Sequence, residues 1–119
     1  MAKHNELGKK GEQLAVDFLL KKGYRILTRN YRFQKTEVDI IAQKKGTLAI
    51  VEVKTRSTVD FGNPQDFAKP KQIQRLVQAV DEYVNANNLD VEVRFDIIAI
   101  VKKGNGFTIE HLENAFYHF

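Results

Sequence analysis

The segment between residues 37 and 56 constrains this chain most, because it places charged residues inside two apolar strand-like runs. The first run reads Glu-Val-Asp-Ile-Ile and the second Leu-Ala-Ile-Val-Glu-Val-Lys-Thr-Arg, with a basic, glycine-containing turn at residues 44–46 between them. Asp39 lies in the first run, and Glu52 and Lys54 lie in the second. A charge in a core strand is costly unless it is paired or binds a metal. The pattern therefore favours a functional site.

Strand geometry predicts how these groups are arranged. Alternation places Glu52 and Lys54 on one face, about 7 Å apart along the strand. A hairpin with a favourable register brings Asp39 beside Glu52, close enough for the two carboxylates to share one cation. Oxygen ligands without His or Cys select Mg²⁺ or Mn²⁺ over Zn²⁺. The alternative is an edge strand whose alternating charges form a solvated face with cross-strand ion pairs.

Glu12 is a further candidate, at the border of the apolar stripe of a helix predicted over residues 5–22. It reaches the same metal if the N-terminal half of that helix covers the second and third strands. The other interpretation is a solvated glutamate at the helix boundary.

The rest of the chain predicts an α/β sandwich around a mixed sheet, in the order α-β-β-β-α-β-β. After the first helix, which Gly23 closes, strands are expected from Tyr24 to about Phe33, over 37–43 and over 47–55. A loop over 57–69, a helix from Pro70 to residues 85–88, and strands over 91–101 and 107–112 complete the prediction. We predict one domain spanning residues 1–119.

The charge distribution agrees with a polyanionic partner. The net charge is +4, with +6 over residues 1–35, +2 over 36–75 and −4 over 76–119. A basic surface around an acidic pocket suits a nucleic acid whose scissile phosphate meets a metal; a solvated lysine-rich surface is the simpler explanation. The chain has no cysteine, no signal-like N-terminus and no membrane-length apolar run, so a cytoplasmic location is expected.

Several other residues invite interpretation. Arg56, Lys71 and Arg75 flank the predicted site and are candidates for binding phosphates, as is Arg32. Tyr24, Tyr31 and Phe33 alternate with arginines and either stack bases or, as we favour, pack in the core. Asp96 is expected to pair with Arg94 or another cation, or to support the site. His4, His111 and His118 lack metal-ligand spacing and are predicted to lie on the surface.

The chain resembles the bacterial family UPF0102, also called YraN, within the PD-(D/E)xK superfamily of restriction-endonuclease-like nucleases. The resemblance covers nearly the whole chain. It is carried by Gly8-x-x-Gly11-Glu12-x-x-Ala15, Gly23-Tyr24-x-Ile26-Leu27-x-x-Asn30-Tyr31-Arg32, Glu37-Val38-Asp39-Ile40-Ile41, Val51-Glu52-Val53-Lys54-Thr55-Arg56, Phe61-Gly62, Lys71 and Arg94-Phe95-Asp96. One departure is Thr36, where the family usually has glycine.

The resemblance implies a restriction-endonuclease-like three-layer sandwich and a metal-dependent nuclease site. Asp39, Glu52 and the Val53 carbonyl would ligate Mg²⁺, and Lys54 would orient the attacking water and stabilise the phosphorane. Glu12 would ligate a metal-bound water or a second ion, as in archaeal Holliday-junction resolvases, which the motif order resembles. Those resolvases act as dimers, so a homodimer is implied by analogy.

Three functions are then open. The first is an endonuclease acting on DNA, including branched or repair intermediates. The second is a nucleic-acid-binding module that keeps the nuclease fold but cleaves little. The third is an interaction protein with a charged sheet face. The intact acid-acid-lysine set favours the first over the third.

Overall fold

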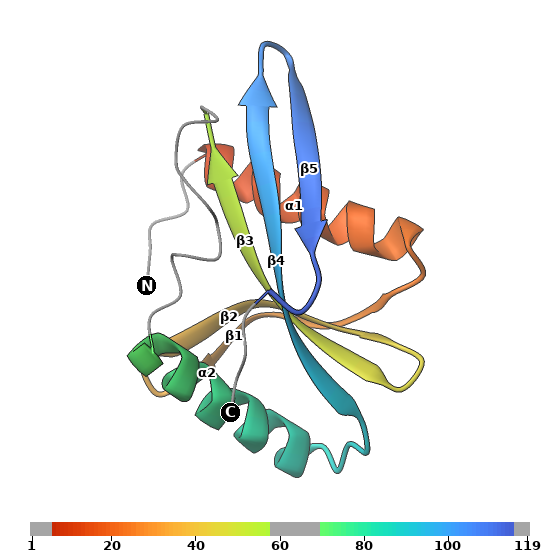
Figure 1. Cartoon of the computed structure of the whole chain (residues 1–119), viewed down its shortest axis with the longest axis vertical. Coiled ribbons are helices and arrows are strands. Elements are labelled where there is room, and N and C mark those ends of the chain that lie inside the picture. The colour runs from red at the N-terminus through yellow and green to blue at the C-terminus, as the bar shows by residue number, and fades with distance from the viewer. Residues whose placement is uncertain (1–5, 58–69, 116–119) are drawn as a thin grey trace.

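A computed structural model describes residues 6–57 and 70–115 of the 119-residue chain (Figure 1). Its elements are helix α1 (Glu6–Lys21), strands β1 (Arg25–Phe33), β2 (Thr36–Lys44) and β3 (Thr47–Arg56), helix α2 (Pro70–Ala86), and strands β4 (Glu92–Lys103) and β5 (Gly106–Leu112). The predicted order is confirmed, and the boundaries differ by one or two residues. Residue 5 of the predicted first helix and nearly all of the 57–69 loop lie outside the described residues.

The five strands form one mixed sheet in the order β1-β2-β3-β4-β5. The β1–β2, β2–β3 and β4–β5 pairs are antiparallel, and β3 and β4 are parallel. A parallel pair needs a crossover connection, and α2 lies within this one. The strand that carries Glu52 and Lys54 is therefore central, as its two-sided apolar sequence predicts.

The helices cover opposite faces of the sheet, which makes the molecule a three-layer α/β sandwich as predicted (Figure 1). On the α1 face, Ala15 and Leu19 pack against Val51 and Ile98. On the α2 face, Val80 packs with Leu48, Ile50 and Phe95. Burial of these apolar side chains on both faces supplies the main stabilisation of the fold.

Helix α1 lies unusually close to β3 because Gly11 has no side chain. A Cβ atom built at Gly11 would lie 2.0 Å from Oγ1 of Thr55. The helix ends where predicted: Gly23 adopts a φ of 96°, and the N–H of Tyr24 donates to the carbonyl of Leu19 at 3.0 Å. This is the hydrogen-bond pattern of a glycine-terminated helix. The close approach at Gly11 fixes the height of the neighbouring Glu12 above the sheet.

Candidate functional site

The candidate site lies where β2 and β3 separate. Their hydrogen-bonded register runs from Lys44↔Thr47 to Ile40↔Val51 and stops there. Asp39 and Glu52 are the next residues on each strand. Beyond this point, Glu52 and its successors pair with β4, while the residues before Ile40 pair with β1. The two strands therefore form a fork with one carboxylate on each arm.

The Asp39 side chain accepts a hydrogen bond from a β3 backbone N–H that lies beyond the last β2–β3 pair. The backbone N–H of Val53 donates a hydrogen bond of 2.8 Å to Oδ2 of Asp39. Asp39 also lines a small cavity of about 40 Å³ together with Glu52, Glu37 and Leu76. Asp39 and Glu52 therefore border one cavity, which Leu76 of α2 also lines.

The electrostatics of Asp39 show how acidic this region is. The pKa of Asp39 is raised from 3.8 to about 6. Burial is the largest cause; the Val53 hydrogen bond opposes the rise, and the nearby negative charges of Glu52, Glu12 and Glu37 add to it. Helix α1 thus brings Glu12 close enough to influence the fork, as one of the two interpretations of that residue requires. A bound cation would relieve this repulsion.

Lys54 supplies positive charge beside the acids. Its Nζ lies 2.7 Å from Oε2 of Glu52, and the two side chains are 19% and 44% exposed. Both residues follow Leu48 and Ile50 on the α2 face of β3, so the predicted parity is confirmed. Because the Lys54 side chain is largely shielded from solvent, water screens this ion pair less than it would screen a fully exposed one.

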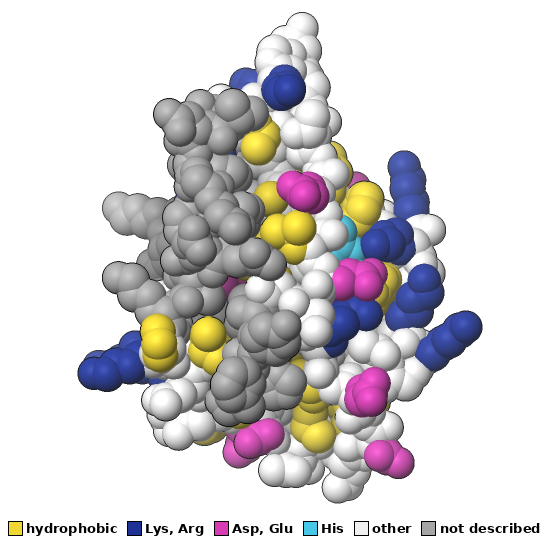
Figure 2. Space-filling model, in the orientation of Figure 1, with side chains coloured by type: hydrophobic (Ala, Val, Ile, Leu, Met, Phe, Trp, Pro, Cys, Tyr) yellow, Lys and Arg dark blue, Asp and Glu magenta, His cyan; other side chains and the backbone are white. Residues whose placement is uncertain are grey.

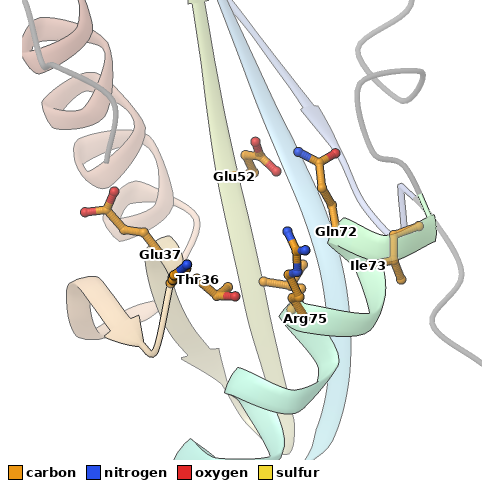
Figure 3. Close-up of a pocket in the computed structure, with 8 residues that line it drawn as sticks. Thr36, Glu37, Glu52, Gln72, Ile73 and Arg75 are labelled. Carbon is orange, nitrogen blue, oxygen red and sulfur yellow. The ribbon is translucent and has the colours of Figure 1, made fainter.

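A cleft of about 200 Å³ opens from Glu52 toward α2. Its walls are the β1–β2 turn and the first turns of α2, and Gln72 and Arg75 extend from the helix toward Glu52 (Figure 3). The lining residues are Lys35, Thr36, Glu37, Glu52, Gln72, Ile73, Arg75 and Leu76. The cleft thus combines acidic, basic and apolar walls.

The other predicted binding residues are distributed more widely. Arg32 and Lys71 are exposed, and Arg56 donates to the carbonyl of Thr55 at 2.9 Å. Of the four basic residues predicted to bind nucleic acid, Arg75 is the one that lines the cleft beside Glu52. Within the described ranges, no group of three or more Asp, Glu, His or Cys side chains is arranged to hold a metal ion together.

Two of the three aromatic residues next to the β1 arginines, Tyr24 and Tyr31, pack within the protein. Tyr24 is 5% exposed and belongs to the α1-side core. Tyr31 packs edge-on against Tyr83, with ring centroids 5.1 Å apart. The core interpretation of Tyr24 and Tyr31 is therefore confirmed, and base stacking on Tyr24 is not compatible with its burial.

One buried polar network was only partly predicted. Asp96 is fully buried on the α1 face and forms a two-pronged ion pair with Arg94, at 2.9 and 2.8 Å. Nε2 of His111 lies 2.8 Å from the same carboxylate, and the backbone N–H of Asn114 donates to it at 3.0 Å. Burial alone would raise the pKa of Asp96, but these hydrogen bonds hold it below its usual value. Pairing with Arg94 was one of the alternatives predicted for Asp96.

The predicted surface position of His111 is wrong. Its side chain is 3% exposed and packs edge-on against Phe18, while Nζ of Lys22 donates to its Nδ1 at 2.8 Å. Alternation along β5 carried the signal, because Phe107 and Ile109 occupy the same inward face. His4 and His118 lie outside the described residues.

Basic side chains also gather away from the fork. Figure 2 shows Lys and Arg side chains along the right-hand edge of the molecule, where Figure 1 places the end of α1 and the β2–β3 hairpin. Exposed residues of these segments include Lys21, Lys44 and Lys45. Across the ranges that the structure describes, no helix is both long and apolar enough to cross a membrane.

These features define a three-layer α/β protein with an acidic fork and a lysine beside it. The chain belongs to the uncharacterised protein family UPF0102, whose family model matches residues 11–100. That range contains Glu12, Asp39, Glu52 and Lys54. The family membership predicted from the motifs is therefore confirmed.

Relatives of this family match along all or nearly all of their length. The chain is 66% identical to UPF0102 proteins of Flavobacterium psychrophilum and of Christiangramia forsetii, over 100% of each chain in both cases. It is 47% identical to one from Phocaeicola vulgatus, over 98% of this chain and 97% of the relative. Among solved structures, Pyrococcus furiosus SfsA in complex with Ca²⁺ matches at 17% identity and a TM-score of 0.38, covering 90% of this chain and 62% of that chain. That likeness is too low to support an argument about the site.

Proposed function

We propose that this protein is a Mg²⁺- or Mn²⁺-dependent endonuclease that hydrolyses phosphodiester bonds in DNA, including branched or repair intermediates. The observation that supports this most is the fork: Asp39 and Glu52 line one cavity, and Lys54 lies 2.7 Å from Glu52. Two carboxylates and a lysine at the end of a strand pair are a suitable set for hydrolysing a charged diester.

The fork residues fit a hard divalent cation. Mg²⁺ is commonly held by one or two carboxylates and keeps several waters, so it does not require three protein ligands. Asp39 and Glu52 would provide the carboxylates, with the Val53 carbonyl as a further oxygen ligand and Glu12 reaching a water or a second ion. The elevated pKa of Asp39 supports this assignment, because burial first and then the neighbouring acids disfavour its charged form, and a bound cation would favour that form.

Each residue then has a chemical task. The ion, when bound, supplies Lewis-acid activation of water and of the diester. Glu52 now pairs with Lys54, and neutralisation of Glu52 by a cation would release the lysine ammonium toward the substrate. Lys54 would then stabilise the negative charge that develops on phosphorus, without losing its own proton. Its partial burial strengthens that interaction.

The alternative is a nucleic-acid-binding module with little intrinsic cleavage. The observation that favours it is the Lys54–Glu52 ion pair itself, which occupies both groups. Binding would then depend on basic residues such as Arg32, Arg56, Lys71 and Arg75, and would fall with rising salt. We also propose that the protein is a homodimer, whether it acts as an endonuclease or as a nucleic-acid-binding module.

The test is cleavage of duplex, flap and four-way-junction DNA by purified protein with Mg²⁺ or Mn²⁺. We expect cleavage that Asp39→Asn, Glu52→Gln and Lys54→Met abolish, and that the matched surface variant Lys103→Met retains. Salt-sensitive binding without cleavage, unchanged in the three fork variants, would support the binding module instead. Native size-exclusion chromatography with light scattering would test the homodimer.

A further inference from the structure

The cleft beside the fork contains two basic side chains that face it from different elements. Lys35 comes from the β1–β2 turn and Arg75 from α2, and both are exposed. Neither forms an ion pair or hydrogen bond with any other residue in the described parts of the chain. Unpaired cations on both walls of a cleft are suited to bind an anion that enters between them.

The remaining walls indicate which kind of anion fits. Ile73 and Leu76 make one wall apolar, while Gln72 and Thr36 offer neutral polar groups (Figure 3). The acids Glu37 and Glu52 lie on the side that faces the fork. A ligand with a charged group, a polar ring and an apolar edge matches these walls better than a free inorganic anion does. A sugar-phosphate unit of a nucleic acid has that character.

The size of the cleft limits how nucleic acid can enter. About 200 Å³ is room for roughly one sugar-phosphate unit and too little for a base-paired duplex, whose major groove alone is about 12 Å wide. None of the eight described residues that line the cleft is aromatic, so these walls offer no platform on which bases stack. We therefore expect contacts in the cleft to involve the sugar-phosphate backbone of the nucleic acid and not to depend on base identity.

We infer that this cleft binds one nucleotide of a single-stranded or unpaired strand, with Lys35 and Arg75 contacting its phosphate. The inference rests on the proposed function in one respect: the course of the bound strand is chosen so that its neighbouring phosphate would lie at Glu52. The observations behind the inference are separate from those behind the proposed function, because Lys35 and Arg75 are not among the fork residues Asp39, Glu52 and Lys54. A preference for flaps and frayed ends over intact duplex follows.

The experiment is fluorescence anisotropy with a labelled ten-residue oligothymidylate and a fully paired hairpin of equal charge, in EDTA, across a salt series. EDTA removes any cleavage, so the result does not depend on whether the fork is catalytic. We expect the native protein to bind the single strand more tightly than the hairpin. The double variant Lys35→Ala/Arg75→Ala should weaken single-strand binding by about tenfold and reduce the salt slope by about 0.7, the value for one single-strand phosphate that is no longer neutralised.

The matched control is Lys102→Ala/Lys103→Ala, which removes two exposed lysines at the end of β4. This control removes the same net charge as the Lys35/Arg75 variant. We expect its affinity for the single strand to stay within about twofold of that of the native protein. Circular dichroism melting would confirm that both double variants fold. An unchanged salt slope in the Lys35/Arg75 variant, or equal losses in the two double variants, would overturn the inference. Tighter binding of the hairpin by the native protein would overturn its single-strand part.

Discussion

Replacing Asp39 with asparagine tests the electrostatics of the fork through protein stability. The pKa of this carboxyl is raised from 3.8 to about 6, first by burial and then by neighbouring acids. The folded state therefore favours the protonated acid, and ionisation of Asp39 destabilises the fold. One pKa unit corresponds to about 1.4 kcal/mol at 25 °C, so the full shift corresponds to about 3 kcal/mol.

The sign of the pH dependence follows from linkage. Below pH 3.8 the group is protonated in both the folded and the unfolded state and its ionisation costs no stability. As the pH rises from 3.8 to about 6, the unfolded chain ionises first and the native protein loses stability. Above about pH 6 the loss is complete and constant. Asparagine stays neutral and keeps one oxygen to accept the Val53 N–H, so Asp39→Asn avoids this loss.

The assay is urea denaturation of native and Asp39→Asn protein at half-unit steps from pH 4 to pH 8, without divalent ions. We expect the two to be similar near pH 4 and the variant to be more stable by about 1–3 kcal/mol above pH 6.5, where the lower bound allows for relaxation around the site. The exposed acid Asp90, changed in the same way to asparagine, is the matched control and should show no such divergence. A difference that does not change with pH, or a variant less stable than native at pH 8, would refute the reasoning.

Three further results are expected. Added Mg²⁺ should raise the thermal midpoint of native protein but not of Glu52→Ala, because a ligand stabilises only a state that binds it; equal shifts in both would place the ion elsewhere. Gly11→Ala should destabilise by about 1–3 kcal/mol in urea, since its Cβ would lie 2.0 Å from Thr55 Oγ1, whereas Gly46→Ala meets nothing within 4 Å and should cost less; equal costs would contradict the close packing of α1. Asp96→Asn should destabilise by about 3 kcal/mol at pH 7, because Arg94 and His111 lose a buried anionic partner; a loss below about 1 kcal/mol would show that the network contributes little.

Much of this architecture could be predicted because local sequence and tertiary packing agree. Alternation in β3 correctly placed Glu52 and Lys54 with Leu48 and Ile50, and the turn at residues 44–46 set the β2–β3 hairpin. The run before Glu52 is apolar on both faces, which identified β3 as a central strand before its neighbours were known. Gly23 marked the end of α1 for a similarly local reason, since it adopts a positive φ.

Other features depend on contacts that no local pattern specifies. The fork arises because β2 pairs with β3 only from Ile40 to Lys44, while its pairing with β1 continues back to Thr36; this register cannot be derived from either strand alone. Gly11 lies within the predicted first helix, but its close approach to Thr55 depends on the height at which α1 crosses β3. His111 was misplaced because histidines were judged by metal-ligand spacing, while its partner Asp96 lies on the adjacent strand. The lysine-and-arginine cleft combines a turn with a distant helix, and only Arg75 of its basic pair was predicted.

The most direct test of the account is a crystal structure with Mn²⁺, located by its anomalous scattering. The account predicts a peak at the β2–β3 fork, in contact with one oxygen of Asp39 and one of Glu52, that disappears in crystals of Asp39→Asn. A fork without a peak at saturating Mn²⁺, with manganese bound only at exposed acids such as Asp81 or Glu82, would contradict it.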